Sequence, residues 1–435
     1  MSSSCCASVL DDCAALAEKV AREDATFVAE AATLCENARS TMPIALVDLT
    51  ALGSTARLRG IGRYVAELAA ALAQTARGEP GLQLLGVEQL PVIGPAEITV
   101  DLGGAAARAL RSERRAQSHL AWAYRLRLGL AGAARRVRAD VVHTPEPEAT
   151  PLGPCGCPRV TTCHDLVELH YPDHYASWRD GYRLGRRLLD HRRYHSADHV
   201  IAVSEATAHD LMTMLGVPAA RITVVLSGAD LSRWSPEPQP TDAQVRARLG
   251  LGERPYLLYV GGADWRKNHE GMLGALAIAR SRSGTRELEL AWAGKLPATD
   301  RARVLATARS LELEPALRLL DFVPDAELGA LYRGAVGNLF VSRAEGFGYP
   351  VLEAMAAGCP VVASHCSSIA EVAGDAALGV DPEDHEAIAE AIVAIGRSAD
   401  ERRRWRERGL ARAQHFGLER MGRETLAVYR RLCRG

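Results

Sequence analysis

Residues 337–364 read GNLFVSRAEGFGYPVLEAMAAGCPVVAS, and this stretch decides the fold. The apolar run at 337–342 predicts a buried strand, and residues 351–358 have helical composition that ends at Gly358. Residues 360–364 predict the next strand. The stretch therefore predicts a strand, a tight loop, a helix and a second strand, which is the repeating unit of a parallel α/β sheet.

The loop of this unit combines two glycines with two glutamates. Gly346 and Gly348 let backbone N–H groups approach a ligand closely, because they carry no Cβ and tolerate positive φ. Pro350 can start the following helix, whose N-terminus favours a phosphate or a hydroxyl-rich ligand. Glu345 and Glu353 supply carboxylate acceptors for sugar hydroxyls. Their spacing alone is expected by chance among 53 acidic residues, but with the loop and the strands it predicts a nucleotide-sugar site.

Length and composition set the broad class. A chain of 435 residues that is 48% hydrophobic exceeds the usual size of one core, so we expect two domains. A net charge of −1 gives no whole-chain reason to expect a nucleic-acid partner. The sequence contains no run of about 18 apolar residues, so we expect no membrane-spanning helix. Asp11 and Asp12 stand where a secretory signal would be basic and apolar, so a cytoplasmic location is the default expectation.

The ten cysteines do not form the pattern of a disulfide scaffold. Cys155, Cys157 and Cys163 with His164 could in principle bind a metal, but their spacing matches no common zinc site. We expect buried free thiols and no metal.

Two series of short apolar runs alternate with helical stretches, and this pattern predicts two Rossmann-like halves with a ligand at the carboxyl ends of the strands. The first series comprises residues 43–50, 139–145, 158–166, 199–204 and 222–227, and the second comprises 256–262, 288–294, 316–323, 337–342 and 360–364. The predicted parts of the chain are a helical extension at 1–42, a first Rossmann-like domain at 43–240 and a second at 241–415, followed by a C-terminal segment at 416–435.

Several polar residues follow the predicted strands. Arg266 and Lys267 precede a helix expected near Asn268; because the chain has only three lysines, this pair stands out as a candidate diphosphate site. His164 and Asp165 end another strand, where an imidazole can bond a substrate and a carboxylate can fix its tautomer.

The sequence GIG at 60–62 precedes a predicted helix. It is weak evidence for a ligand loop, because Val65 stands where a dinucleotide fingerprint has its third glycine.

Two arginine-rich stretches allow two interpretations. Between 108 and 138 there are nine arginines and one acid, Glu113, so this stretch is either a basic face for an anionic membrane or a solvated helix in an arginine-biased chain. Residues 178–195 also contain Asp180 and Asp190, and they favour an ordinary surface helix.

The combined motifs resemble the retaining glycosyltransferases of family 4, which have the GT-B fold. The motifs are YVGGADWRKN (259–268), EGFGYPVLEAMAAGCPVVAS (345–364), SSIAEVAGDAALGVDP (367–382), FGLERMGRETLAVYRRL (416–432) and, less specifically, GIGRYVAEL (60–68), HDL (164–166), VSEAT (203–207) and LSGADLSRWSP (226–236). The resemblance covers roughly residues 43–432. It implies two Rossmann-like domains that face a central cleft: an acceptor domain at 43–240, joined by a crossover helix at 416–435, and a nucleotide-sugar donor domain at 241–415.

The resemblance also implies roles for individual residues. Arg266 and Lys267 would hold the donor diphosphate, Glu345 would face the transferred sugar, and Glu353 would meet the ribose. His164 would lie near the reacting centre, so the implied catalytic residues are His164, Glu345, Arg266 and Lys267. The other implied donor-binding residues are Gly262, Val323, Gly346, Phe347 and Gly348, and the other implied residues of the acceptor domain are Gly60, Ile61, Gly62 and Asp165.

The resemblance implies transfer of a hexose, with retained anomeric configuration, to a hydroxyl group and without a metal cofactor. Mannosyltransferase-like motifs favour GDP-mannose as donor, with a UDP-hexose as the alternative. The acceptor would be a saccharide, a lipid-linked saccharide at the inner face of the cell membrane, or a small natural product. Two departures from the family's pattern are Ser227 in place of Asn and Leu418 in place of Trp.

Two other classes stay open. A nicotinamide-dependent oxidoreductase is disfavoured, because the third glycine and a suitable acid at a strand end are missing. A nucleotide-sugar-binding scaffold without activity is disfavoured by the presence of Arg266, Lys267, Glu345 and Glu353, although these residues could serve binding alone.

Overall fold

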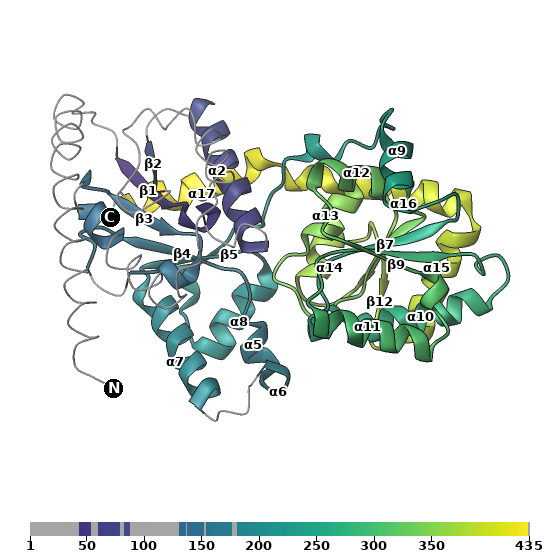
Figure 1. The fold of residues 1–435 in the computed structure, drawn as a ribbon. Helices are drawn as coiled ribbons and strands as arrows, with labels where there is room; N and C mark the ends of the chain where they lie inside the picture. The colour runs from purple at the N-terminus through teal and green to yellow at the C-terminus, as the bar shows by residue number, and fades with distance from the viewer. Residues whose placement is uncertain are drawn as a thin grey trace, which may run out of the picture. The chain divides into compact units, whose positions relative to one another are not determined.

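The computed structural model describes residues 43–53, 60–78, 82–87, 130–135, 137–151, 154–175 and 181–433. Their strands form two six-stranded parallel sheets with helices packed on them, which confirms the predicted α/β class (Figure 1). The predicted extension at 1–42 and most of the basic stretch at 108–138 lie outside the described residues.

The first sheet has the strand order β2-β1-β3-β4-β5-β6. Its strands are β1 (Ile44–Asp48), β2 (Gln83–Val87), β3 (Val141–Thr144), β4 (Arg159–Cys163), β5 (His199–Ala202) and β6 (Ile222–Val224). Five of these strands were predicted. The strand β2 was not predicted, because its run QLLGV contains a glycine, a poor strand former.

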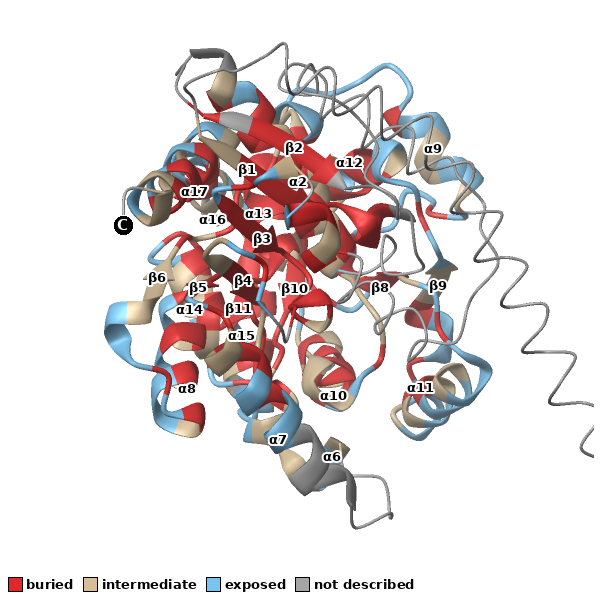
Figure 2. Ribbon diagram, turned by 90° about the vertical axis from the view of Figure 1, so that its left-hand side faces the viewer, coloured by how far each residue is buried: buried red, intermediate tan, exposed pale blue. Residues whose placement is uncertain are grey.

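The second sheet has the strand order β12-β11-β10-β7-β8-β9. Its strands are β7 (Tyr256–Val260), β8 (Glu289–Ala293), β9 (Leu317–Asp321), β10 (Gly337–Phe340), β11 (Val361–Ser364) and β12 (Leu378–Val380). The strands β8, β10 and β11 are buried along their whole length, which explains their continuous apolar runs (Figure 2). The sequence analysis missed β12, which has only three residues.

The order of the second sheet reverses between β7 and β10. The chain adds β8 and β9 on one side of β7, and then β10, β11 and β12 on the other. The loops that leave the carboxyl ends of β7 and β10 therefore diverge from neighbouring strands, and ligands of open α/β sheets bind at such a switch point.

Helices cover both faces of this sheet. Figure 1 shows α10 and α11 on one side and α12 and α13 on the other; α15 packs on α10, and α16 packs on α13. The helices of this part of the chain are α9 (Asp242–Arg248), α10 (His269–Ser281), α11 (Ala298–Ser310), α12 (Asp325–Gly334), α13 (Tyr349–Ala356), α14 (Ser367–Ala373), α15 (His385–Arg397) and α16 (Ala399–Ala413). The remaining helices are α2 (Gly60–Gly78), α5 (Val167–His170), α6 (Pro172–Tyr175), α7 (Gly181–Ser196), α8 (Glu205–Leu215) and α17 (Leu418–Cys433).

The contacts divide the chain into two compact units. The first comprises Met1–Thr161, Arg193–His199 and Thr425–Gly435, and the second comprises Thr162–Arg192 and Val200–Glu424. The end of α17 belongs to the first unit, where Tyr429 and His143, both buried, are joined by a hydrogen bond of 2.5 Å. The boundaries predicted from the sequence at 42, 240 and 415 stay predictions.

Candidate active site

The loop after β7 is fixed by two side chains that cap short helical turns. Asp264 caps the turn Trp265–Lys267 by accepting a hydrogen bond from the backbone N–H of Arg266, at 3.1 Å. Asn268 adopts a left-handed conformation with φ of 54° and caps α10 by accepting from the N–H of Gly271. Asparagine tolerates this conformation better than most residues. These caps confirm the predicted helix start near Asn268 and hold Arg266 and Lys267 at the switch point.

Asn268 also ties this loop to its neighbours. Its fully buried amide donates to the carbonyl of Val341 after β10, at 3.2 Å, and to that of Pro382 after β12, at 2.6 Å. From the sequence, Asn268 was expected only to mark the start of a helix. In the structure its side chain connects the loop after β7 to the loops after β10 and β12.

Arg266, Lys267 and Glu345 form one cluster within the second unit. Glu345 Oε2 lies 2.9 Å from Arg266 Nη1, and Glu345 Oε1 lies 2.5 Å from Lys267 Nζ. The backbone supports the same approach, because the N–H of Arg343 donates to the carbonyl of Arg266 at 2.7 Å. The structure thus brings together the predicted diphosphate-binding pair and the predicted sugar-facing carboxylate, from loops about 78 positions apart in the sequence.

The charges of this cluster depend on one another because it is largely buried. The Glu345 side chain is 7% exposed, that of Lys267 15% and that of Arg266 24%. Burial alone would raise the pKa of Glu345, but Lys267 and Arg266 hold that pKa below its usual range. Burial lowers the pKa of Lys267, against the opposing effect of Glu345. The two cations therefore favour the ionised form of Glu345. Arg266 also faces Asp264 Oδ1 at 3.5 Å and Asp165 Oδ2 at 3.9 Å.

Two serines at the start of α14 position the backbone of Glu345. The Ser367 hydroxyl accepts from the N–H of Glu345 at 3.2 Å, and the fully buried Ser368 hydroxyl donates to its carbonyl at 2.7 Å. The sequence analysis missed this function. The sequence did contain one indication of this function, since Ser367 and Ser368 begin a helix shortly after a strand.

The glycine loop is confirmed in part. Gly348 has φ of 96° and stands at the N-cap of α13, whose first turn contains Pro350 as predicted. At Gly346 a Cβ would overlap the backbone carbonyl of His164, so close packing also requires this glycine, and its approach to a ligand stays a prediction. Because Gly346 has no side chain, the backbone carbonyl of His164 can pack against it. Phe347 is buried, and its ring contacts those of Tyr349 and Phe416.

Glu353 lies inside α13, as predicted, and is only 2% exposed. Its carboxylate accepts a hydrogen bond of 3.0 Å from the hydroxyl of Tyr332, a residue of α12 that the sequence analysis did not single out. Burial and this donor hold the carboxylate in one orientation.

The other predicted site residues have distinct places. Asp165 Oδ2 lies 3.9 Å from Arg266 Nη1, and Asp165 Oδ1 accepts a hydrogen bond of 3.3 Å from the N–H of Val167. The Gly262 carbonyl accepts from the Tyr259 hydroxyl at 2.8 Å. Val323, which follows β9, is buried.

The prediction for the first glycine pair needs a correction. Gly60, Ile61 and Gly62 form the first turn of α2, whereas the sequence analysis placed them in a loop before that helix. Two glycines lower helix propensity, but the apolar stripe that follows stabilises the helix through packing.

The six cysteines in the described part of the chain are free thiols, with Cys155 and Cys163 buried as predicted and Cys157 half-buried. Burial raises the pKa of Cys157 to about 12, so this thiol stays protonated. No group of three or more metal-ligating side chains occurs in the described ranges, which omit residues 1–42 and 88–129 among others.

Comparison with known proteins identifies the family. The model named "Glycosyltransferase Family 4" matches residues 58–233, and the model named "Glycosyl transferases group 1" matches residues 242–412. O-antigen chain mannosyltransferase B of Escherichia coli is 32% identical to this chain over 86% of the chain and 97% of that protein.

Solved structures show the same fold. Sucrose-phosphate synthase of Thermosynechococcus elongatus has a TM-score of 0.67 and 20% identity, and the match covers 90% of this chain and 99% of that one. Anabaena Alr3699/HepE in complex with UDP and glucose has a TM-score of 0.66 and 17% identity, covering 90% of this chain and all of that one. The chain has the GT-B fold, belongs to glycosyltransferase family 4, and is a hexosyltransferase.

Proposed function

We propose that the protein transfers mannose from GDP-mannose to a hydroxyl group of a saccharide acceptor and retains the anomeric configuration. The observation that carries this proposal is the cluster of Arg266, Lys267 and Glu345, which combines two cations with one carboxylate at the switch point of the second sheet. The similarity to O-antigen chain mannosyltransferase B supports mannose as the transferred sugar.

In this mechanism the two cations act on the leaving diphosphate. Negative charge grows on the diphosphate as the glycosidic bond breaks, so preorganised donors there stabilise the transition state more than the bound substrate. Arg266, Lys267 and the N-terminus of α13 supply such donors. Loss of one of them is expected to cost about 3 kcal/mol in the activation barrier, or roughly a hundredfold in rate.

Glu345 positions the transferred sugar. When the diphosphate takes over part of the charge of Arg266 and Lys267, the carboxylate of Glu345 becomes available to sugar hydroxyls as an acceptor. The departing phosphate then removes the proton of the acceptor hydroxyl on the same face, which keeps the configuration. No metal takes part in this proposal.

The remaining assignments follow the same logic. The fixed carboxylate of Glu353 accepts from the ribose hydroxyls, and Gly262, Val323, Phe347 and the backbone at Gly346 and Gly348 line the donor. His164 and Asp165 lie near the reacting centre, with Gly60, Ile61 and Gly62 on the acceptor side.

A UDP-hexose is the second candidate donor. Its support is the structural similarity to Alr3699/HepE, which was solved with UDP and glucose. A matched assay separates the two: purified protein is incubated with GDP-mannose or UDP-glucose and mannotriose, and the product is analysed by NMR. We expect a new α-mannosidic linkage with GDP-mannose. A β-linked product would refute retention, and a product formed only with UDP-glucose would favour the second donor.

We place the reaction in the cytoplasm at the inner face of the cell membrane, with a lipid-linked saccharide as one candidate acceptor. The part of α7 with described side chains supports this, because Leu188 and Leu189 are 55% and 48% exposed between the exposed Arg187 and Arg192. Exposed leucines flanked by arginines suit an anionic bilayer surface. Within the described residues, no helix is long and apolar enough to cross a membrane.

A further inference from the structure

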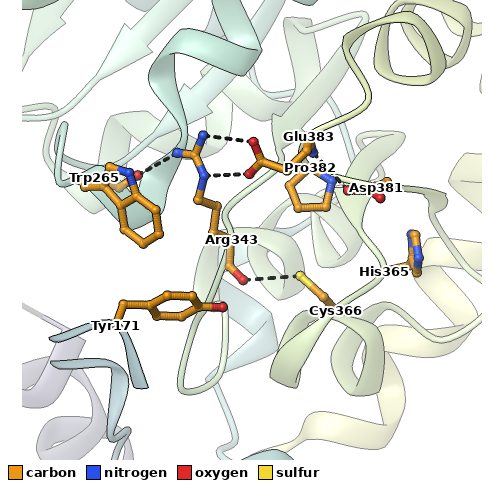
Figure 3. A pocket seen from close by; sticks show the side chains of 8 residues that line it. All are labelled: Tyr171, Trp265, Arg343, His365, Cys366, Asp381, Pro382 and Glu383. Carbon is orange, nitrogen blue, oxygen red and sulfur yellow. Dashed lines mark hydrogen bonds and ion pairs between the residues drawn. The ribbon is translucent and has the colours of Figure 1, made fainter. Parts of the chain in front are cut away.

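A pocket of about 500 Å³ opens beside the Glu345 cluster within the second unit (Figure 3). Its walls come from the loops that leave the carboxyl ends of β7, β10, β11 and β12, and from the α5–α6 segment. Its lining residues include Tyr171, Trp265, Arg343, Cys366, Asp381 and Glu383. The volume falls in the usual range of small-molecule sites.

The pocket shares its walls with the proposed donor site. Trp265 directly precedes Arg266, and Arg343 stands two positions before Glu345. Cys366 directly precedes Ser367, and its thiol contacts the carbonyl of Arg343 at 3.3 Å. A ligand in this pocket would therefore contact the same three loops that hold the Glu345 cluster.

The charges of the pocket disfavour an anion. Arg343 forms a bidentate ion pair with Glu383, at 2.6 and 3.2 Å, and its third donor binds the carbonyl of Trp265 at 3.0 Å. Its positive charge is thus matched within the protein. Asp381 adds a negative charge and also accepts from the backbone N–H of Glu383 at 2.9 Å. The pocket is therefore not a second phosphate site.

The remaining chemistry suits an uncharged ligand rich in hydroxyl groups. Carboxylate oxygens of Asp381 and Glu383 can accept hydrogen bonds from such hydroxyls. The ring of Tyr171 adds an apolar surface to the polar one. Its centroid lies 5.1 Å from that of Trp265, whose ring stacks on His174 and lies 4.8 Å from the Arg343 guanidinium. Figure 3 shows the two rings on the side of the pocket opposite Asp381.

We propose that this pocket binds a sugar unit of the acceptor saccharide. This inference rests on the proposed function, because it assigns the acceptor of that same reaction. It differs from the residues assigned above, since Tyr171, Asp381 and Glu383 belong to neither the donor site nor the predicted acceptor residues.

The test uses the full chain with GDP present and mannotriose as the probe, and it measures saccharide affinity by titration calorimetry. Asp381→Asn keeps the oxygen that caps the turn but loses the charge, and Tyr171→Ala removes one ring. We expect each variant to bind mannotriose about tenfold more weakly than the wild type, the loss typical of one charge-assisted hydrogen bond or one ring contact. Melting temperatures verify that the variants fold.

Glu386→Gln is the matched control, because Glu386 forms an ion pair of 2.6 Å with Arg282 outside the pocket. It should bind mannotriose as the wild type does. Absence of mannotriose binding to the wild type, or equal binding by Asp381→Asn, Tyr171→Ala and the wild type, would overturn the pocket assignment. The thermal shift caused by GDP or UDP reports the proposed function separately: without such a shift in the wild type the proposed function fails, whatever the saccharide result.

Discussion

Replacing Glu345 by Gln should separate the binding of a nucleotide from catalysis. The substitution preserves the shape of the side chain and removes the negative charge that Arg266 and Lys267 contact at 2.9 and 2.5 Å. Arg266 keeps Asp264 at 3.5 Å and Asp165 at 3.9 Å, whereas Lys267 loses its ion-pair partner in this cluster. Because all three side chains are largely buried, we expect the loss to resemble the breaking of a buried ion pair, about 3 kcal/mol of unfolding free energy. The melting temperature should then fall by roughly 6 to 12 °C.

A nucleoside diphosphate should reverse part of this loss. Its phosphates supply the negative charge that the variant lacks, so GDP should raise the melting temperature of Glu345→Gln more than that of the wild type. The rate of sugar transfer should nevertheless fall roughly a hundredfold, because the positioning carboxylate is gone. Stronger stabilisation by GDP together with slower transfer is a combination that general unfolding would not produce.

The assay combines thermal shift with and without GDP and initial rates of nucleoside diphosphate release. Glu386→Gln serves as control, since its pair with Arg282 is exposed and should contribute less than about 1 kcal/mol. A kcat for Glu345→Gln close to that of the wild type would refute the assigned role of Glu345. A smaller GDP shift in the variant than in the wild type would refute the electrostatic reasoning.

Three further predictions test other parts of the account. Gly346→Ala should lower the free energy of unfolding by about 1–3 kcal/mol in denaturant titrations, because its Cβ would overlap the His164 carbonyl. Gly252→Ala is the control and should be neutral, because a Cβ there meets no atom within 4 Å. Equal stability of the two variants would contradict the predicted overlap. Burial raises the pKa of Asp48 from 3.8 to about 6, so its ionisation lowers stability as pH rises through that window. Asp48→Asn should therefore be more stable than the wild type by roughly 3 kcal/mol at pH 7.5 and about equal near pH 3, below the pKa of both states. A difference independent of pH would argue against a titrating Asp48. Replacing both Leu188 and Leu189 by Ser should reduce co-sedimentation with anionic vesicles at low salt; no change, or no vesicle binding by the wild type, would remove α7 as a membrane contact.

The sequence predicted the fold well where local patterns are strong. The strand, loop and helix at 337–358 appear as β10, Gly348 and α13, because a buried strand, a left-handed glycine and a helix with Pro350 in its first turn each leave a local signature. Short edge strands do not, and β2 and β12 were therefore missed. Gly60 and Gly62 misled the analysis, because tertiary packing placed two helix-breaking residues inside α2.

The individual residues of the site could be predicted from the sequence, but the contacts between them could not. Arg266, Lys267 and Glu345 were identified separately, and only the sheet order brings them together. The support from Ser368 and Tyr332 depends on long-range packing that no local pattern encodes. The overlap between Gly346 and the His164 carbonyl likewise has no signature in either segment alone.

The most direct test of the central claim is a panel of nucleotide sugars incubated with the purified protein, with nucleoside diphosphate release and thermal shift measured together. We expect a clear shift and GDP release with GDP-mannose, and GDP release roughly a hundredfold slower with Lys267→Ala at the same concentrations. Silence of the wild type across GDP-sugars and UDP-sugars in both measurements would contradict the proposed nucleotide-sugar site.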